Sequence, residues 1–201
     1  MTPAPDADRT ARRTAAGRGR LFVLSGPSGV GKGTVLAQIR ARQPGLWFSV
    51  SVTTRAPRPG EVAGEQYHFV DDSEFDRLIA AGDFLEHASY AGHRYGTPRR
   101  PVERRLALGA PALVEVEVQG ARQVRASMPA AFLIFLAPPS WDELVRRLVG
   151  RGTEDADSVA RRLDIARDEL SHEGEFDAVV VNDDVEAAAS RVVTLILNPP
   201  G

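Results

Sequence analysis

The chain has 201 residues, and its 25 Lys and Arg against 27 Asp and Glu give a formal net charge of −2. The chain has no excess of basic residues that would indicate nucleic-acid binding. It also has no cysteine, which excludes disulfides, thiolate metal ligands and cysteine nucleophiles and is compatible with the reducing cytoplasm. No apolar run approaches the ~20 residues that span a bilayer. We therefore expect one cytoplasmic domain, with inserted subdomains, that binds small molecules and neither nucleic acid nor membranes.

The first 20 residues differ in composition from the rest of the chain. Five Arg and two Asp give this segment +5 − 2 = +3, so the remainder carries −5. It is rich in Ala, Thr, Pro and Gly and shows no apolar periodicity. The acidic residues argue against a transit peptide, and the lack of an apolar segment argues against a secretion signal. We expect a disordered tail over 1–19 and a folded domain over 20–198.

Residues 21–42 predict a strand, a glycine-rich turn and a helix. The apolar run 21–24 leads into Ser-Gly-Pro-Ser-Gly-Val-Gly-Lys-Gly-Thr at 25–34, and an amphipathic helix over 31–42 follows. Glycines let backbone N–H groups wrap around phosphates, and a lysine adds a point charge. We therefore expect a phosphate-binding loop rather than a Gly-rich turn without a ligand. Its nucleotide-binding residues are Gly26, Pro27, Ser28, Gly29, Val30, Gly31, Lys32, Gly33 and Thr34, and Lys32 is also a catalytic candidate.

Gly33 departs from the common form of this loop, in which a Ser or Thr directly after the lysine ligates magnesium. Here the hydroxyl comes one place later, at Thr34, which weakens a GTPase or motor-ATPase interpretation. The variant resembles the loop of nucleoside monophosphate kinases. We predict that Mg²⁺ is held mainly by nucleotide oxygens, water and a carboxylate elsewhere, with no dedicated metal site in the protein.

Residues 51–97 are polar and predict an inserted small sheet with one helix, at 73–80. Within them Arg55 and Arg58 lie three apart, and Pro57 stiffens the backbone between them. Two guanidinium groups on a stiff segment suit a second phosphate, separate from that of the loop, and Tyr67 adds a hydroxyl. The alternative is a solvated surface turn, because surface arginine is common.

The remaining elements alternate strand with helix. Apolar runs at 112–118, 132–136 and 178–181 predict strands, and 98–108, 119–127 and 184–197 predict helices, so we expect a parallel sheet covered on both faces. Glu115 and Glu117 lie two apart and should project from one face of their strand as buried carboxylates that face magnesium or substrate. Two Arg-rich helices at 140–149 and 156–173, joined through Gly150 and Gly152, predict a movable lid.

From about Leu21 to about Asn198 the chain resembles a guanylate kinase. The resemblance rests on residues 51–58, 60–62, 95–97, 115–120, 137–140, 151–154 and 181–184, in that order and without large gaps. It implies that ATP and GMP give ADP and GDP, that dGMP is also accepted, and that Mg²⁺ takes part. It also implies an α/β phosphate-loop fold with a core (20–50, 98–139 and 174–198), a GMP-binding region (51–97) and a helical lid (140–173).

The resemblance further implies roles for individual residues. Glu86 is the carboxylate that accepts from N1–H and N2–H₂ of guanine, Ser51 and Thr97 supply hydroxyls, and Glu117 assists. The GMP phosphate is held by Arg55, Arg58, Tyr67 and Tyr95; Gly96 and Glu115 complete the substrate-binding set. Arg151 and Arg162 match lid arginines and join Lys32 and Arg55 as catalytic candidates, while Arg147 and Asn182 are candidates for binding ATP. For Asn182 a turn cap is the alternative.

Two rival functions share part of this pattern. A kinase for AMP, UMP or dTMP would carry the same Gly-Lys-Gly-Thr loop but would not need Glu86 together with Ser51. A guanylate-kinase-like module that binds phosphopeptides without catalysis would lack an intact phosphate loop. The intact loop therefore favours an enzyme.

Overall fold

The computed structural model describes residues 19–90, 92–149 and 156–200, with the side chains of 156–158 left out. The predicted tail lies almost wholly outside the described residues. A five-stranded parallel sheet forms the centre, in the order β2-β7-β1-β8-β9. Its strands are β1 (Leu21–Ser25), β2 (Trp47–Phe48), β7 (Ala112–Glu115), β8 (Phe132–Ala137) and β9 (Ala178–Val181). The predicted parallel sheet is confirmed.

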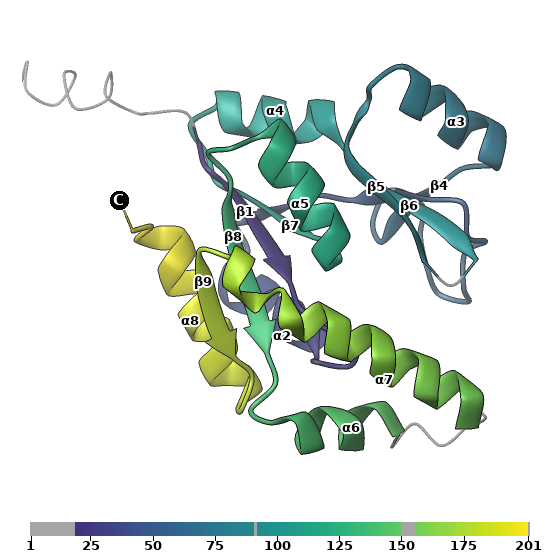
Figure 1. Cartoon of the computed structure of the whole chain (residues 1–201). Helices are drawn as coiled ribbons and strands as arrows, with labels where there is room; N and C mark the ends of the chain where they lie inside the picture. The colour runs from purple at the N-terminus through teal and green to yellow at the C-terminus, as the bar shows by residue number, and fades with distance from the viewer. Residues whose placement is uncertain (1–18, 91, 150–155, 201) are drawn as a thin grey trace, which may run out of the picture.

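Helices cover both faces of this sheet, as its wholly apolar strands require (Figure 1). On one face α2 (Lys32–Arg42) and α8 (Val185–Leu197) pack against Phe22 and Leu24. On the other face α4 (Arg99–Ala107) and α5 (Val118–Ser127) pack against Leu21 and Val23. The alternation of β1 side chains between two apolar layers fixes the strand in the middle of the fold.

The predicted small sheet is confirmed as a mixed sheet of four strands in the order β4-β3-β6-β5. Its strands are β3 (Ser51–Thr53), β4 (Tyr67–Phe69), β5 (Phe84–Tyr90) and β6 (His93–Pro98). Only β3 and β4 run parallel. Helix α3 (Asp72–Ala80), capped by the Asp71 carboxylate, covers this sheet through Phe75.

Strand β5 joins the two sheets' apolar layers. Phe84 packs with Phe75 in the small layer, with ring centroids 4.7 Å apart. The next residue, Leu85, points the other way and packs with Val102 and Val116 in the central layer. The small sheet is therefore fixed to the core along β5.

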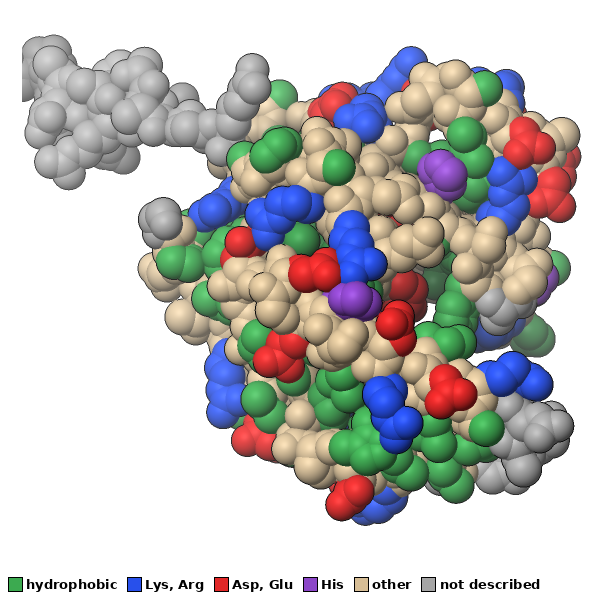
Figure 2. Space-filling view, in the orientation of Figure 1, with side chains coloured by type: hydrophobic (Ala, Val, Ile, Leu, Met, Phe, Trp, Pro, Cys, Tyr) green, Lys and Arg blue, Asp and Glu red, His purple; other side chains and the backbone are tan. Residues whose placement is uncertain are grey.

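Helices α6 (Trp141–Val149) and α7 (Ala156–Ser171), followed by the short η1 (Glu173–Glu175), leave the end of β8. Leu144, Leu148 and Ala166 bury their side chains against Val30 in the apolar layer beneath α2 and α8, which lies on the other face of the central sheet from Leu85. Figure 2 shows the hollow that opens between the small sheet and α7. The predicted hinge at Gly150 and Gly152 lies outside the described residues.

One predicted boundary is wrong. The strand expected to run to Val118 ends at Glu115, and Val118 instead opens α5. Glu117 has extended backbone at the N-cap position of this helix. An apolar run cannot by itself separate the end of a buried strand from the first buried turn of a helix.

Candidate active site

The glycine-rich loop between β1 and α2 has the shape of an anion site. A Cβ on Gly26 would collide with the carbonyl oxygen of Leu136, and Gly31, at the N-cap of α2, has φ +98°. Both positions therefore require glycine. The loop borders a cavity of about 240 Å³ at the N-terminus of α2, where backbone N–H groups favour anions. The lining residues are Pro27, Ser28, Gly29, Gly31, Lys32, Gly33, Thr34, Glu115 and Glu117.

Lys32 places its charge at the centre of this loop. Its Nζ donates to the carbonyl oxygen of Gly26 at 2.6 Å and to Glu117 Oε2 at 3.3 Å. Only 9% of the Lys32 side chain is exposed. The ammonium group is therefore held where a phosphate in the cavity would meet it.

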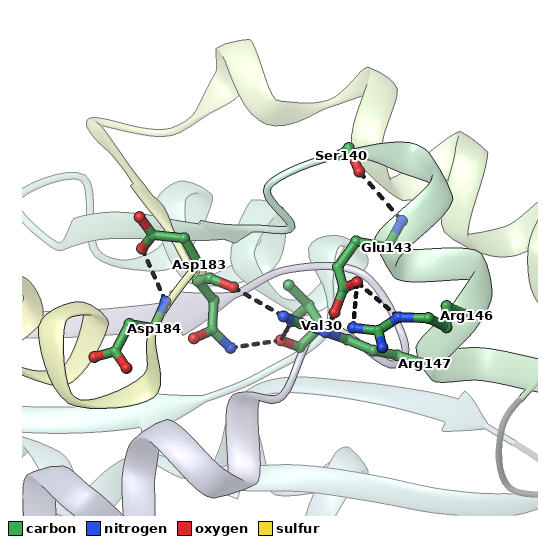
Figure 3. Close-up of polar contacts among 8 residues, drawn as sticks. Val30, Ser140, Glu143, Arg146, Arg147, Asp183 and Asp184 are labelled. Atoms are coloured by element: carbon green, nitrogen blue, oxygen red, sulfur yellow. Dashed lines mark hydrogen bonds and ion pairs between the residues drawn. The ribbon is translucent and has the colours of Figure 1, made fainter.

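Two side chains from outside the loop hold its backbone. The Asn182 Nδ2 donates to the Val30 carbonyl at 2.7 Å, and Arg147 Nη1 donates to the same oxygen at 3.2 Å. Arg147 also donates to the Asn182 carbonyl at 3.2 Å and to Glu143 at 2.7 Å (Figure 3). The N-cap of α8 is Asp184, so Asn182 braces the loop and is not the helix cap there. Asn182 Oδ1 is buried with no hydrogen-bond partner among the described residues.

A second cavity, of about 290 Å³, lies between the central and small sheets. Six residues of the predicted substrate set line it: Ser51, Tyr67, Glu86, Tyr95, Glu115 and Glu117. Glu115 and Glu117 line both cavities, so the phosphate loop and this cavity share a wall.

Glu115 and Glu117 differ from the prediction in burial and geometry. The Glu117 side chain is 39% exposed, and Glu115 is also reached by solvent through the cavities. Because β7 ends at Glu115, the two carboxylates meet at a strand-to-helix junction and not on one strand face. Partial desolvation by the surrounding protein raises the pKa of Glu115, and nearby Lys32 lowers it.

Glu86 is the most enclosed carboxylate of the second cavity, with 7% exposure. Thr97 Oγ1 donates to Glu86 Oε1 at 2.6 Å. Burial raises the pKa of Glu86 to about 6, and the hydrogen bond from Thr97 limits that rise. Since the Thr97 hydroxyl hydrogen is used by Glu86, Thr97 orients the carboxylate here. A carboxylate held in this way presents its remaining lone pairs to adjacent N–H donors.

Arg55 lies beside this cavity with its guanidinium 5.4 Å from the Tyr67 ring centroid. It forms a two-pronged ion pair with Glu61, at 2.9 and 3.0 Å, and Glu61 also accepts from the backbone N–H of Arg58 at 2.7 Å. The ion pair lowers the pKa of Glu61. The Arg58 side chain is exposed. Glu61 thus fixes the segment that carries both arginines.

Sequence reasoning missed Glu169 and Arg40. Glu169, on α7 and 8% exposed, accepts the backbone N–H of Ser28 at 2.9 Å. Its position three residues after Ala166, on the apolar face of the helix, was a signal for a buried carboxylate. Arg40 lines the second cavity and stacks over the Phe48 ring, 3.9 Å from its centroid. Its spacing of four from buried Leu36 was the corresponding signal.

The predicted lid arginines have different outcomes. Arg151 lies outside the described residues. Arg162 lies on α7 and is partly exposed. Their roles stay predictions.

Within the described part of the chain, no three His, Asp or Glu side chains are grouped so that they could hold a metal ion. Nor does that part contain a helix long and apolar enough to cross a membrane.

The fold and the site together define a phosphate-loop nucleoside monophosphate kinase. A parallel sheet carries the loop, and a second cavity with its own arginine segment lies next to it. The guanylate kinase family model matches residues 18–198, so the chain belongs to the guanylate kinase family.

Known proteins agree with this assignment. A guanylate kinase from Frankia casuarinae is 63% identical over 177 residues, covering 88% of this chain and 96% of that protein. One from Mycobacterium bovis is 53% identical over 195 residues, covering 96% and 94%. The crystal structure of guanylate kinase from Anaplasma phagocytophilum superposes with a TM-score of 0.72 at 37% identity, covering 90% of this chain and 86% of that one.

Proposed function

We propose that this guanylate kinase transfers the γ-phosphoryl group of ATP to GMP, and also to dGMP, through the two cavities described above. The observation that carries the proposal is their common wall of Glu115 and Glu117. A phosphate-loop cavity that opens beside a base-recognition cavity lets two nucleotides meet end to end with their phosphates adjacent.

In the second cavity Glu86 selects guanine. Guanine presents N1–H and N2–H₂ as neighbouring donors, and an ionised carboxylate accepts from both. Adenine has an acceptor at N1, which would face the carboxylate oxygen without a hydrogen bond. A polar site of this kind rejects a mismatched base by ~10⁴-fold or more. Ser51 lines the same cavity and supplies a hydroxyl for the base.

The reaction needs neutralisation of the charges on the donor and acceptor phosphates, and it does not need a general base. A phosphate monoester has its second pKa near ~6, so the attacking GMP oxygen is largely ionised at neutral pH. That oxygen forms a bond to the γ-phosphorus while the bond to the β–γ bridging oxygen breaks, and ADP leaves with the electron pair. Lys32 and the backbone N–H groups of the loop neutralise the donor phosphates, and Arg55 with Arg58 holds the acceptor phosphate.

Magnesium fits the phosphate-loop cavity as a nucleotide-bound ion. Among the residues that the structure describes, two carboxylates, Glu115 and Glu117, line that cavity, which is too few for an all-protein site. Phosphate oxygens and waters would hold the ion, and these carboxylates would accept hydrogen bonds from its waters. When bound, Mg²⁺ supplies charge neutralisation along the phosphate chain.

Helices α6 and α7 complete the proposal as the lid, and residues 51–97 as the GMP-binding region. Arg162 on α7, with Arg151, would close on the ATP phosphates. The Asn182 Oδ1, which has no hydrogen-bond partner among the described residues, would accept from the adenine amino group.

Coupled measurement of ADP release with GMP, dGMP, AMP, UMP and dTMP tests this function. We expect turnover with GMP and dGMP, and at least 10³-fold lower kcat/KM with the other three. Equal turnover of AMP or UMP would favour the rival monophosphate kinase. Absence of ADP release with every acceptor would favour a binding module.

A further inference from the structure

Helix α5 approaches strand β5 so closely that Gly120 lies against the Glu86 carboxylate. A Cβ on Gly120 would stand 2.6 Å from Glu86 Oε2 and 3.1 Å from both Glu86 Cδ and Val116 Cβ. The Glu86 side chain is buried and its other oxygen is bonded to Thr97. It therefore cannot move aside without leaving its position in the cavity.

The backbone does not require glycine at this position. Gly120 is the third residue of α5, and it is absent from the glycines with left-handed φ. Glycine inside a helix is less stable than alanine, so its presence here opposes helix formation. A Cβ at this position would crowd Glu86, so the glycine is explained by the room that the recognition carboxylate needs.

Two more residues on the same helix hold the same strand. Gln123 Oε1 accepts the His87 N–H at 3.1 Å, and Gln123 Nε2 donates to the His87 carbonyl at 2.9 Å. One turn further on, Ser127 Oγ lies 3.3 Å from the Leu85 carbonyl and 3.3 Å from the Val124 carbonyl of its own helix, and its one hydrogen is shared between them. Spacings of three and four place these contacts on one face of the helix. These contacts are made to the residues on either side of Glu86, so they fix the position of β5 relative to α5 at Glu86.

We propose that Gly120 and Gln123 are positioning residues for guanine selection, Gly120 by leaving room for the Glu86 carboxylate and Gln123 by fixing its strand. The inference rests on the proposed role of Glu86 as the acceptor for guanine. It assigns part of the base specificity to helix α5. The N-cap of this helix, Glu117, also lines the phosphate-loop cavity.

The chemistry predicts which substrate suffers most from a displaced carboxylate. Guanine uses two parallel N–H donors, so both contacts depend on the position and tilt of the carboxylate. Hypoxanthine keeps N1–H but lacks the 2-amino group, so IMP makes one contact of this kind and tolerates a tilt better. A shift of the order of 1 Å at a reacting or recognising group lowers rates ~10²-fold. The preference for GMP over IMP therefore reports the position of Glu86.

The first experiment compares Gly120→Ala with Gly174→Ala, whose added Cβ has no heavy atom within 4 Å. We expect Gly120→Ala to lower kcat/KM for GMP by ~10- to 100-fold and to lower the GMP-to-IMP ratio at least several-fold. The added Cβ crowds Glu86 and Val116 while alanine favours the helix, so the Tm should fall by only a few degrees. Binding of a non-hydrolysable ATP analogue should stay unchanged. Gly174→Ala should alter none of these. An unchanged GMP-to-IMP ratio in Gly120→Ala overturns the inference.

The second experiment asks whether Gly120 acts through Glu86. Glu86→Asp shortens the side chain by one methylene and withdraws it from the added Cβ. We expect the double variant Gly120→Ala, Glu86→Asp to be no worse than Glu86→Asp alone. Losses that multiply would mean that the two residues act independently, and the positioning role would fail.

A third variant keeps the test valid if Gly120→Ala does not fold. Gln123→Leu removes both bonds to His87 without adding volume beside Glu86, and it should lower the GMP-to-IMP ratio by a smaller factor than Gly120→Ala. An unchanged ratio in a folded Gln123→Leu overturns its role. Failure of the proposed function looks different: Glu86→Gln would then keep normal GMP kinetics. If Glu86→Gln is impaired while Gly120→Ala is normal, only the present inference falls.

Discussion

The Ser28 backbone N–H, in the phosphate loop, donates to Glu169 Oε2 on helix α7 at 2.9 Å, across 141 positions of sequence. A carboxylate from the helical segment thus binds one of the amides that the loop directs toward anions. Burial raises the pKa of Glu169 to about 7, the Ser28 hydrogen bond lowers it, and nearby Glu117 raises it further. The helix and the loop are joined by a group that is costly to ionise.

Stability should therefore depend on the protonation of Glu169. Between its usual pKa of 4.5 and about 7, the folded state binds the proton and the unfolded state releases it. The free energy of unfolding should fall as pH rises through this window, by about 3 kcal/mol for this group. Glu169→Gln removes the titration, so the fall measured by urea denaturation from pH 5 to pH 8 should be shallower. Asp164→Asn, on the exposed face of α7, should keep the parent slope; identical slopes in all three proteins would contradict the assignment.

Lys32→Met should abolish turnover and leave the protein folded. The ammonium group lies in the loop cavity, where it would stabilise charge on the transferring phosphoryl group, and losing one such donor costs ~10²–10³-fold or more in kcat. Methionine fills a similar volume, so the circular dichroism spectrum should be retained. Steady-state ADP release measures the effect. Near-normal activity would mean that the loop does not hold the donor phosphates.

Glu86→Gln should weaken GMP selectively. The amide keeps one acceptor but turns an N–H toward a guanine donor, at a cost of roughly 2–4 kcal/mol in kcat/KM. Binding of an ATP analogue, read by the phosphate loop, should hardly change. Titration with the analogue and kinetics with GMP separate the two. Equal losses for both nucleotides would assign Glu86 to the fold.

The same residue should shape the pH profile. Because the pKa of Glu86 is about 6, the carboxylate that accepts from guanine is progressively neutralised below that pH. The kcat/KM for GMP should therefore fall as pH decreases through about 6. The GMP phosphate also protonates near ~6, and that part should persist in Glu86→Gln. If the variant and the parent fall equally steeply, Glu86 makes no ionised contact with the base.

Glu61→Ala should raise KM for GMP by about tenfold and leave KM for ATP unchanged. The two-pronged ion pair fixes the Arg55 guanidinium, and losing a charged hydrogen-bond partner costs about 1.5 kcal/mol. Glu65→Ala is the matched control, since Glu65 is exposed in the same segment. Kinetics at varied GMP and at varied ATP give both constants. A raised KM in the control as well would point to the loop backbone and not to Arg55.

Local patterns predicted those parts of the fold whose neighbours lie close in sequence. The apolar runs gave the four long strands of the central sheet, and the glycine spacing gave the phosphate loop. Strand β2 was not predicted, because it has only two residues, Trp47 and Phe48, and they pair with β7, more than 60 positions away. Its existence follows from tertiary contact and not from periodicity.

The site shows the same division. Glu86, Tyr67 and Tyr95 were placed by motif, and the structure brings them to one cavity. The contacts of Glu61 and Glu169 could not be found by motif. Glu61 meets Arg55 and Arg58 only through the shape of their turn, and Glu169 meets a backbone N–H 141 positions away. A carboxylate on an otherwise apolar helix face is the local sign that such a distant partner exists.

Adjacent residues of β5 tie the protein's thermal behaviour together. Phe84 is packed in the layer beneath α3, while Leu85 is packed in the layer beneath α4 and α5. Melting either layer pulls this strand away from the other, so neither has a separate folding equilibrium. The chain should therefore show a single calorimetric endotherm. A variant without the small sheet should unfold, because Val102 and Val116 would no longer be packed against Leu85.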